Sequence, residues 1–541
     1  MDIRADVLII GSGVAGALLA CELAGKGASV VIMEAGPRVD RAEAVRRFHT
    51  AYPKTPESAY PQSSFTPHPK TESPHGFYAQ KGSDAFNSTY LRQVGGTTWH
   101  WLGTAVRLIP DDFRMKSLFG LATDWPLSYD DLEPWYCRAE AELEVSGDDA
   151  QDLGSPRSAA YPLPSVPQSF LDRRWEEALR GSRFELRPTP QARLSKASSG
   201  RPSCHGSASC IPVCPIQAKY DATIHIARAE ALGARLLTEA CANFIGSHED
   251  GRVAAVRFRR PDGSEGRVES RVVAVAANAM ETPRLLLASR SSGSPEGVAN
   301  RSGLVGCNLM DHPIQLSWAL AHEPVWPYRG PGATSGIETF RRSARRATDS
   351  ALRFEIGNEG WSWPTGAPES TARDLAMSGL SGKALDRALR EQTSRHIRIA
   401  ALTEQLPLAE NRMTLDWSRM ERTGLPGMEI AYRLDTYTQG ALASAKRMHE
   451  EMFERVGVTS FWHKDKAEAA GHIMGTARMG DDPRRSVVDR ELRAHDHRNL
   501  FLIGAAVFPT GGTANPTLTV AALAIRAAGP VLAALAEAPR P

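Results

Sequence analysis

The stretch ADVLIIGSGVAG at residues 5–16 decides the fold of the N-terminal part of the chain. Its first half, Ala5–Ile10, is a short apolar run rich in β-forming residues, and glycines follow it at once. Apolar residues then recur at helical spacing over Val14–Leu23, and Ser29–Met33 has the composition of a second strand that ends at Glu34. This order of strand, glycine turn, helix, strand and acid predicts a dinucleotide-binding unit.

Each glycine of the turn has an expected role. Gly11 allows the tight turn, Gly13 lets a pyrophosphate approach the backbone, and Gly16 lets the helix and the strand pack closely. The phosphates are expected at the helix N-terminus, where unpaired N–H groups and the helix dipole favour anions. Glu34 is placed to accept hydrogen bonds from an adenosine ribose, and an acid there disfavours a 2′-phosphate. The unit therefore predicts FAD or NAD rather than NADP.

The composition is that of an ordinary globular protein. The 541 residues are too many for one core, so at least two domains are expected. A hydrophobic content of 42% and a charged content of 23% exclude a disordered chain, and the net charge of +2 predicts no nucleic-acid or anionic-membrane surface. Seven cysteines are too few for a disulfide scaffold of this size. The first expected strand begins at residue 5, which leaves no room for a signal peptide. The apolar tail, Thr517–Ala536, contains Arg526 and Pro530 and is therefore a poor membrane span.

The remaining chain divides into segments of different character. Residues 52–76 are rich in proline and serine and predict a surface loop or arm. Residues 311–470 mix alternating strands with helices and predict a substrate domain on an antiparallel sheet, whereas residues 471–541 return to the nucleotide domain. The expected helices are 124–141 (starting at Ser128 or Asp130), 220–232, 281–289, 370–393, 438–456 and a closing helix from Asn515. The expected strands are 234–238, a hairpin of 243–259 and 265–275, 314–320, 397–402 and 499–504.

A double glycine leads into an aromatic segment, Gly95-Gly96-Thr97-Thr98-Trp99-His100-Trp101. Two glycines let the backbone pass close to a flat ring, and tryptophan side chains are able to form the wall of a pocket. The same pattern is equally typical of a turn in the core with buried aromatic residues. The spacing alone does not decide between a cofactor contact and a packing turn.

Three cysteines cluster as C-x5-C-x3-C at Cys204, Cys210 and Cys214, with Pro215 directly after the last. Thiolates are soft ligands that suit iron–sulfur clusters, zinc or Cu(I), and a C-x3-C-P ending is typical of bacterial ferredoxins. A Cys3His zinc site with His205 is an alternative, although His205 adjoins Cys204 and would share one metal with it awkwardly. A disulfide is a further alternative that leaves one thiol unpaired. The spacing favours an iron–sulfur cluster, and three cysteines suit a three-iron cluster.

A histidine stands between glycines in Gly471-His472-Ile473-Met474-Gly475. Oxidation of an alcohol requires loss of the hydroxyl proton as hydride leaves carbon, and neutral imidazole titrates in the right range to take that proton. Downstream, Asn515, Pro516 and Thr517 open the closing helix. Asn515 is either the N-cap of this helix or a hydrogen-bond partner of the substrate hydroxyl beside His472. The same helix N-terminus is placed to stabilise negative charge on a reduced flavin.

Together these motifs resemble those of the glucose–methanol–choline (GMC) oxidoreductase family over nearly the whole chain. The likeness is strongest to catalytic subunits of bacterial FAD-dependent sugar and polyol dehydrogenases, of the glucose, gluconate, fructose and sorbitol types. Agreement across dispersed motifs is far more specific than any one of them. The residues that carry it are GSGVAG at 11–16 with Glu34, RQVGGTTWHW at 92–101, RPSCHGSASCIPVCPIQAKY at 201–220, AANAMETPRLLL at 276–287, NLMDHP at 308–313, and the segments around His472 and Asn515.

The resemblance implies an α/β fold in which an FAD-binding Rossmann-like domain, with a mostly parallel sheet, is joined to an α+β substrate domain with an antiparallel sheet. The FAD-binding domain is expected to comprise residues 1–45, 85–115, 200–310 (with the iron–sulfur loop 201–220) and 471–541; residues 46–84, 116–199 and 311–470 form the substrate domain and surface arms. A noncovalent FAD is expected to contact Gly11, Gly13, Gly16, Glu34, Gly95, Gly96, Thr97, Thr98, Trp99, Ala277, Asn278, Asn515, Pro516 and Thr517. A 3Fe–4S cluster is expected on Cys204, Cys210 and Cys214.

The resemblance also implies partner proteins. Relatives work with a small export or chaperone subunit, which carries the export signal, and with a multihaem cytochrome c that receives electrons. The chain is therefore expected at the periplasmic face of the inner membrane, with membrane association only through a partner.

The resulting hypothesis is a dehydrogenase in which a hydroxyl-bearing carbon of a sugar or polyol gives hydride to flavin N5. His472 removes the hydroxyl proton, Asn515 positions the oxygen, and electrons leave singly through the cluster to a cytochrome or dye. One alternative is an alcohol oxidase or quinone-linked dehydrogenase of the same family without a cluster. Another is a noncatalytic flavoprotein that only transfers electrons.

Overall fold

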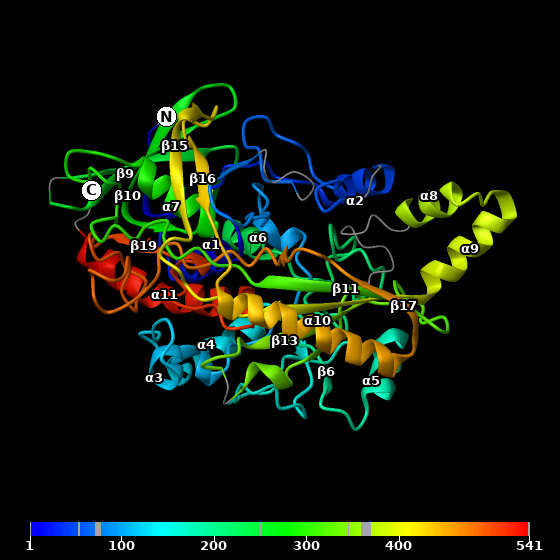
Figure 1. Cartoon of the computed structure of the whole chain (residues 1–541). Helices are drawn as coiled ribbons and strands as arrows, with labels where there is room; N and C mark the ends of the chain where they lie inside the picture. Colours follow the sequence, from blue (N-terminus) through cyan, green and yellow to red (C-terminus); the bar gives the residue numbers. More distant parts are fainter. Residues whose placement is uncertain are drawn as a thin grey trace.

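The computed structural model describes residues 2–51, 55–70, 77–248, 250–343, 346–358 and 369–538. Two large sheets organise this part of the chain, and each has its own hydrophobic core (Figure 1). The first sheet is mostly parallel, and the second is antiparallel. The predicted fold class, a Rossmann-like α/β domain joined to an α+β domain, is confirmed.

The first sheet carries the glycine turn. Its strand order is β7-β2-β1-β10-β9-β8, and β19 pairs with β10. Ile9 on β1 lies beside Ile32 on the parallel strand β2, and both side chains are fully buried. A strand that is covered on both faces must be apolar throughout, which explains the continuous run at residues 7–10. The strands are β1 (Asp2–Ile10), β2 (Val30–Met33), β7 (Arg235–Leu237), β8 (Cys241–Ser247), β9 (Val253–Arg259), β10 (Glu265–Val275) and β19 (Leu500–Leu502).

Helices cover the faces of this sheet. Helix α1 (Val14–Gly25) begins directly after the turn and packs against α6 (Thr223–Ala231) and α11 (Thr517–Glu537). Because α1 lies between these helices and the sheet, most of its residues are buried, and it is apolar around its circumference. Helix α4 (Tyr129–Glu142) packs on α11, and Ser128 caps its N-terminus, as the sequence predicted for one of two positions.

The second sheet has the strand order β17-β11-β14-β13-β12-β6, and β18 pairs with β11. Helices α10 (Thr436–Val456) and α5 (Phe170–Leu179) pack together on one face of it (Figure 1). The predicted antiparallel substrate sheet is therefore present. Its strands are β6 (Leu186–Pro188), β11 (Pro313–Ala321), β12 (Ser335–Ile337), β13 (Leu352–Gly357), β14 (His396–Thr403), β17 (Val458–His463) and β18 (Glu468–Ala469).

The opposite face of the second sheet is available to a ligand. On β14, Ile399 and Ala401 lie in the core under α10. The alternate residues Arg398, Ala400 and Leu402 face the other side, because successive side chains of a strand point to opposite faces. There they line a cavity.

A third, smaller sheet joins segments that are distant in sequence. It contains β3 (Tyr78–Gln80), β16 (Pro426–Ala431) and β15 (Arg412–Met420), and β15 packs against α7 (Asn278–Ala288). Met428 of this sheet lies in the first core, as do residues of α4. Segments assigned to the substrate domain thus contribute to both cores, and the domain boundaries themselves stay a prediction.

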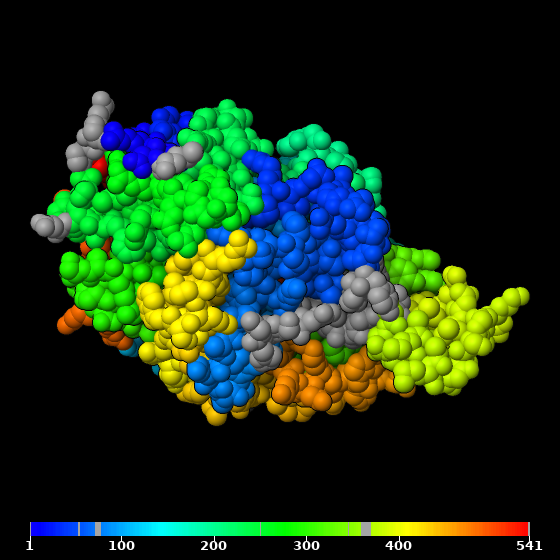
Figure 2. All heavy atoms as spheres, turned by 90° about the horizontal axis from the view of Figure 1, so that it is seen from above, coloured from blue at the N-terminus to red at the C-terminus, as the bar shows by residue number. Residues whose placement is uncertain are grey.

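Helices α8 (Glu369–Met377) and α9 (Gly382–Arg395) form a hairpin that projects from the body (Figures 1 and 2). The prediction of one helix over 370–393 is wrong, because Gly379 between the two helices has a φ of +96° and ends the helical path. The remaining described α-helices and strands are α2 (Arg41–Thr50), α3 (Met115–Phe119), β4 (Ser146–Gly147) and β5 (Leu163–Pro164).

One further prediction needs correction. The expected strand 243–259 is two strands, β8 and β9, separated by a turn at Gly251, which has a φ of +80°. Residues 55–70, within the predicted arm, contain no helix or strand, but Tyr60 and Phe65 are buried, so this part packs on the body. Residues 52–54 and 71–76 of the predicted arm lie outside the described residues.

One helix of the described chain, α11, is long and apolar enough to cross a membrane, with a mean hydropathy of 1.9. However, 67% of this stretch is buried inside the protein, against α1 and α4. Helices in the cores of folded domains have the same length and composition.

Candidate functional site

A cavity of about 620 Å³ lies between the glycine turn and the open face of the second sheet. Its wall is assembled from segments that are far apart in sequence. At one end are the turn and Glu34, and at the other are Ile314 and Leu316 of β11. The predicted residues on the wall are Gly11, Gly13, Glu34, Gly96, Thr97, Thr98, Ala277, Asn278, His472, Asn515, Pro516 and Thr517, whereas Gly16, Gly95 and Trp99 lie outside it.

The three glycines of the turn have the geometry that the sequence predicted. Gly11 has a φ of +105°, and a Cβ there would overlap the carbonyl oxygen of Ala276. A Cβ on Gly16 would overlap the carbonyl oxygen of Gly11, so the helix and the strand touch at this point. Beyond Gly13, in contrast, no other described residue comes within 4 Å of an added Cβ. This open space at the N-terminus of α1 suits a pyrophosphate.

Glu34 is buried in the wall of the cavity at the end of β2. Its Oε2 accepts hydrogen bonds from the Ser12 hydroxyl at 2.6 Å and the Ser12 N–H at 3.1 Å, and its Oε1 accepts one from the Gly36 N–H at 2.9 Å. Burial raises the pKa of Glu34, and these hydrogen bonds oppose the shift. The Ser12 hydroxyl also accepts a bond from the Gly95 N–H at 3.2 Å, which joins the first two motifs. The contact of Glu34 with a ribose stays a prediction.

The segment Gly95–Trp101 combines both interpretations of its sequence. Gly96 lies close to the glycine turn, since a Cβ added to Gly96 would be 3.3 Å from the Cα of Gly13. Trp101 lines the cavity. Trp99 instead packs away from it, with its ring under the guanidinium of Arg41 at 4.4 Å. The close glycine approach and the core turn are thus parts of one structure.

Apart from arginine nitrogens, three buried polar atoms on the cavity wall have no hydrogen-bond partner among the described residues. They are Asn87 Oδ1, His100 Nδ1 and Thr104 Oγ1. Buried polar groups in native proteins are nearly always paired, so their partner is expected to be a polar ligand. FAD, with its carbonyl, amide and hydroxyl groups, fits this requirement. Sequence analysis assigned none of these atoms, because no local pattern marks them.

A chain of hydrogen bonds fixes the protonation of His472. His312 Nε2 lies 3.0 Å from the carbonyl oxygen of Gly512, which only accepts, so this nitrogen carries the proton. His312 Nδ1 is then an acceptor, and it lies 2.8 Å from His472 Nδ1, which must donate. The remaining nitrogen, His472 Nε2, therefore carries a lone pair and no proton. It lies 3.4 Å from Asn515 Nδ2.

Two charged residues hold the amide of Asn515. Its Oδ1 accepts from Arg353 Nη1 at 3.2 Å, and its Nδ2 donates to Glu355 Oε1 at 3.3 Å. These contacts decide which end of the amide carries the N–H groups, and they direct an N–H group toward His472. The N-cap of α11 is Pro516, so the alternative role of Asn515 as N-cap is wrong.

Asp311 holds the backbone around the two histidines. Its Oδ1 accepts from the N–H of His472 at 2.9 Å and from the N–H of His312 at 2.6 Å, and its other oxygen accepts from the Ser88 hydroxyl. Burial raises the pKa of Asp311 to about 7, although the backbone donors act in the opposite direction. The carboxylate thus anchors both backbone segments that carry the His312–His472 contact.

Both imidazoles are neutral at neutral pH. Burial lowers the pKa of His472 well below its usual value, and His312 and Arg353 lower it further. Burial also lowers the pKa of His312 to about 4. A neutral imidazole with one free nitrogen beside an amide donor is equipped to take a proton from a hydroxyl and to bind its oxygen.

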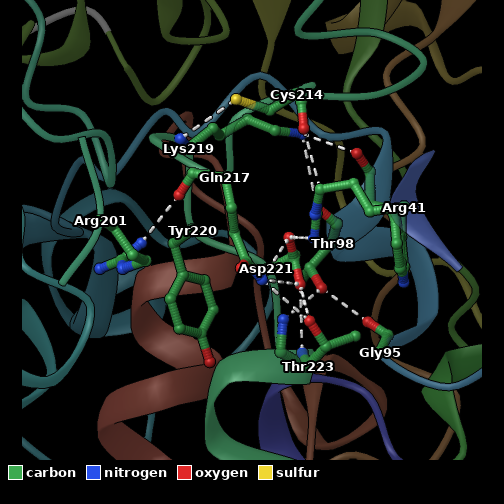
Figure 3. A network of polar contacts seen from close by, with 12 residues as sticks. Arg41, Gly95, Thr98, Arg201, Cys214, Gln217, Lys219, Tyr220, Asp221 and Thr223 are labelled. Atoms are coloured by element: carbon green, nitrogen blue, oxygen red, sulfur yellow. Dashed lines mark hydrogen bonds and ion pairs between the residues drawn. The ribbon is translucent and has the colours of Figure 1, made fainter. Parts of the chain in front are cut away.

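The cysteine loop lies beside the aromatic segment (Figure 3). All seven cysteines are free thiols, so the disulfide alternative is wrong. Among the described residues, no group of three or more His, Cys, Asp or Glu side chains is arranged to hold a metal ion, so the predicted 3Fe–4S cluster has no support here and stays a prediction. Each sulfur of the loop accepts a hydrogen bond: Cys204 from the Gly206 N–H (3.4 Å), Cys210 from Arg193 Nη2 (3.0 Å) and Cys214 from the Lys219 N–H (3.5 Å).

Comparison with known proteins agrees with this geometry. Two family models described as GMC oxidoreductase match residues 192–314 and 407–524, and one described as FAD binding domain matches residues 6–64. The chain is 37% identical to the fructose dehydrogenase large subunit of Gluconobacter japonicus, over 98% of each chain. It is 28% identical to 2-methyl-1,2-propanediol dehydrogenase of Mycolicibacterium austroafricanum, over 97% of this chain and 94% of the relative. The fold is shared with formate oxidase of Aspergillus oryzae RIB40, with a TM-score of 0.66, 16% identity and 98% of each chain covered.

The Rossmann-like sheet, the glycine turn and the histidine–asparagine pair in one cavity define a flavin-dependent oxidoreductase. The chain belongs to the GMC oxidoreductase family. It is therefore an FAD-dependent oxidoreductase that acts on CH–OH groups.

Proposed function

We propose that this enzyme is a dehydrogenase that oxidises a hydroxyl group of a sugar or polyol. The observation that carries the proposal is the free lone pair of His472 Nε2, held beside the amide of Asn515 in the FAD cavity. The names of two relatives, a fructose dehydrogenase large subunit and a diol dehydrogenase, support this substrate class.

The two residues divide the work on the substrate hydroxyl. His472 Nε2 accepts the hydroxyl proton, and Asn515 Nδ2 donates a hydrogen bond to the oxygen, on which negative charge develops. The hydrogen bond from His472 Nδ1 to His312 holds the imidazole in the tautomer that this step requires. When bound along the glycine turn and the helix N-terminus, FAD supplies the hydride acceptor.

The wall of the second sheet supplies groups that recognise a polyhydroxy substrate. Glu355 on β13 and Arg398 on β14 both line the cavity beside Asn515, with apolar Leu402 close by. A carboxylate accepts hydrogen bonds from hydroxyl groups, and a guanidinium donates to them. Arg398 lies across Gly357, where any side chain would overlap its guanidinium. A sugar presents several hydroxyl groups to such a wall, whereas a simple alcohol presents one.

We further propose that electrons leave through a 3Fe–4S cluster on Cys204, Cys210 and Cys214. The donor set fits such a group, because thiolate sulfurs in clusters commonly accept N–H hydrogen bonds, as all three sulfurs do here. In a cluster each thiolate binds a different iron atom, so the sulfurs need not converge on one point as they do around a single metal ion. When bound, the cluster would carry single electrons.

The expected partner proteins follow from the proposed transfer of electrons through the cluster. The relative named as a large subunit supports a multi-subunit complex, and the proposed partners are a small export or chaperone subunit and a multihaem cytochrome c. With them the enzyme would work at the periplasmic face of the inner membrane. Co-purification of the chain with and without these candidate subunits, followed by cell fractionation, tests the assembly and the location.

The central experiment is anaerobic flavin reduction with a panel of sugars and polyols. The wild-type protein is expected to bleach its flavin with at least one of them. His472→Ala is expected to keep FAD but to lose most of the reduction rate, whereas His322→Ala, at an exposed histidine, is the matched control. An unchanged rate in His472→Ala would eliminate His472 as the base.

The same preparations separate the alternatives. Iron and acid-labile sulfide in the wild type support the cluster, and a yellow protein without iron contradicts it and favours an oxidase or quinone-linked dehydrogenase. The oxygen consumption of the reduced protein then distinguishes those two. If no sugar, polyol or simple alcohol bleaches the flavin, the dehydrogenase proposal is wrong.

A further inference from the structure

Within the described part of the chain, two buried cations beside the cysteine loop lack a carboxylate hydrogen-bond partner. Lys219 and Arg193 are each 1% exposed. Lys219 Nζ contacts backbone carbonyl oxygens alone among the described residues, and Arg193 Nη2 contacts the carbonyl oxygen of Leu102 and the sulfur of Cys210. The other terminal nitrogen of Arg193, Nη1, is buried and has no hydrogen-bond partner in the described part of the chain. Two positive charges are thus enclosed at one place.

Within the described chain, the thiols of the loop and the Asp221 carboxylate are the groups whose negative charge acts on Lys219. Burial of a cation without an opposite charge is strongly unfavourable, so proteins rarely leave one uncompensated. Cys210 and Cys214 act on Lys219 electrostatically, and Arg193 acts on Cys204. Thiolate sulfurs, which lose their protons on binding a metal centre, would balance the two charges. The site therefore has the charge pattern expected around an anionic centre that the thiolates form.

Lys219 also joins the loop to the wall of the FAD cavity. Its Nζ lies 3.0 Å from the carbonyl oxygen of Cys210, 2.6 Å from that of Trp101 and 2.8 Å from that of Trp99. Trp101 and Thr98, whose carbonyl oxygen is 3.4 Å away, both line the cavity. Figure 3 shows Lys219 between the cysteine loop and the segment that carries Thr98. One ammonium group thus fixes the spacing between two sites.

A hydrogen-bond path continues from the segment that carries Thr98 to the glycine turn. The Thr98 hydroxyl donates to the carbonyl oxygen of Gly95 at 2.6 Å, and the Gly95 N–H donates to Ser12, which contacts Glu34. Arg41 holds the other end of the loop, through the carbonyl oxygen of Cys214 at 2.9 Å (Figure 3). The loop is therefore tied to the FAD cavity at more than one point.

We infer that Lys219, together with Arg193, is the counter-charge of the redox centre on the cysteines and raises its reduction potential. The inference rests on the proposed cluster. Reduction of the centre adds one electron, and breaks and forms no bond, so a fixed positive charge nearby stabilises the reduced form. Lys219 is a positioning residue: it touches neither the substrate nor the reacting atoms.

The test compares Lys219→Met with Lys219→Arg and with Lys196→Met, which removes an exposed lysine from the segment that leads into the loop. Each protein is assayed for FAD, iron and acid-labile sulfide, and its cluster is titrated with dithionite in a spectroelectrochemical cell. In Lys219→Met the equilibrium constant for reduction of the cluster is expected to fall at least tenfold, which is 59 mV for one electron. Lys219→Arg and Lys196→Met are expected to stay close to the wild type.

Arg193→Gln is the second variant, and a fall in the same direction is expected. Lys219→Met protein that contains FAD but no iron also supports the inference, because the charge is then needed to hold the centre. Iron-loaded Lys219→Met and Arg193→Gln with unchanged potentials would overturn it. Loss of FAD and iron together from Lys219→Met, with Arg193→Gln unchanged, would also overturn it. Wild-type protein without iron is a separate outcome, which removes the proposed cluster itself.

Discussion

Replacement of His312 tests whether a neighbouring imidazole sets the tautomer of His472. His312→Leu removes the acceptor 2.8 Å from His472 Nδ1, although residue 312 itself is expected to touch neither substrate nor flavin. The buried His472 Nδ1–H is then left without a partner, or the proton moves to Nε2 and the free lone pair beside Asn515 is lost. Either result weakens the base without removing it.

The size of the effect follows from the cost of that change. A buried donor left without its acceptor costs about 1–3 kcal/mol. At about 1.4 kcal/mol for each factor of ten, the rate of flavin reduction by substrate is expected to fall about 5- to 150-fold. The reduction rate at saturating substrate should carry the loss, and the apparent substrate affinity should change little, because His312 lies behind His472 and is absent from the cavity wall.

The assay is stopped-flow anaerobic flavin bleaching of protein with a measured FAD content. His312→Asn is the conservative variant, since its amide oxygen is able to accept from His472 Nδ1, and it is expected to recover part of the rate. The wild-type rate is expected to be flat above pH 6.5, because burial lowers the pKa of His472 below its usual value and the base is already neutral there. Equal rates for wild type, His312→Leu and His312→Asn, at equal FAD content, would refute the tautomer argument.

Three further predictions concern the cavity and the fold. Gly16→Ala is expected to lose FAD, because the added methyl group overlaps the carbonyl oxygen of Gly11. The control variant Gly25→Ala, in the same helix, is expected to keep FAD. The absorbance ratio of flavin to protein in the purified samples measures the FAD content of both variants. Gly357→Ala is expected to displace Arg398 and to raise KM for the best substrate several-fold with FAD retained, and an unchanged KM would exclude Arg398 from substrate binding. The denaturation midpoint is expected to fall between pH 7 and pH 5, because histidines with depressed folded pKa values bind protons only when unfolded, and each contributes up to about 1.4 kcal/mol per pH unit. Asp311, with a pKa raised to about 7, and Glu34, whose pKa burial also raises, oppose the histidines but are fewer. A midpoint that rises on acidification would contradict this; the histidines are His68 and His312 (pKa about 4), His100 and His449 (about 3), and His396 and His472, whose pKa values burial also lowers.

The nucleotide unit could be predicted from sequence because its determinants are local. The conformation of Gly11 in the turn and the contact of Gly16 with Gly11 lie within one strand, turn and helix, and the structure gives the three glycines the expected geometry. The second sheet was predicted for a similar reason, since alternation along β11 and β14 has a period of two that is visible in one strand. The division of the segment 370–393 into two helices was not predicted, because it depends on the positive φ of Gly379.

His472 and Asn515 were identified in the sequence as candidates, but their relation was not. The partner that sets the tautomer, His312, comes from the start of β11, and the residues that orient the Asn515 amide, Arg353 and Glu355, come from β13. No local pattern marks these side chains as members of one site.

What the sequence by itself determined was the FAD-binding unit, the fold class and the candidate site residues, a histidine, an asparagine and three cysteines. Only the tertiary structure decided which nitrogen of His472 is unprotonated, which face of the second sheet lines the cavity, and that Lys219 and Arg193 bring buried charge to the cysteine loop. The physical reason is the range of the interactions: turns, caps and strand alternation act over a few residues, whereas hydrogen bonds and charges act over a few ångströms between segments that only the packing of the sheets brings together.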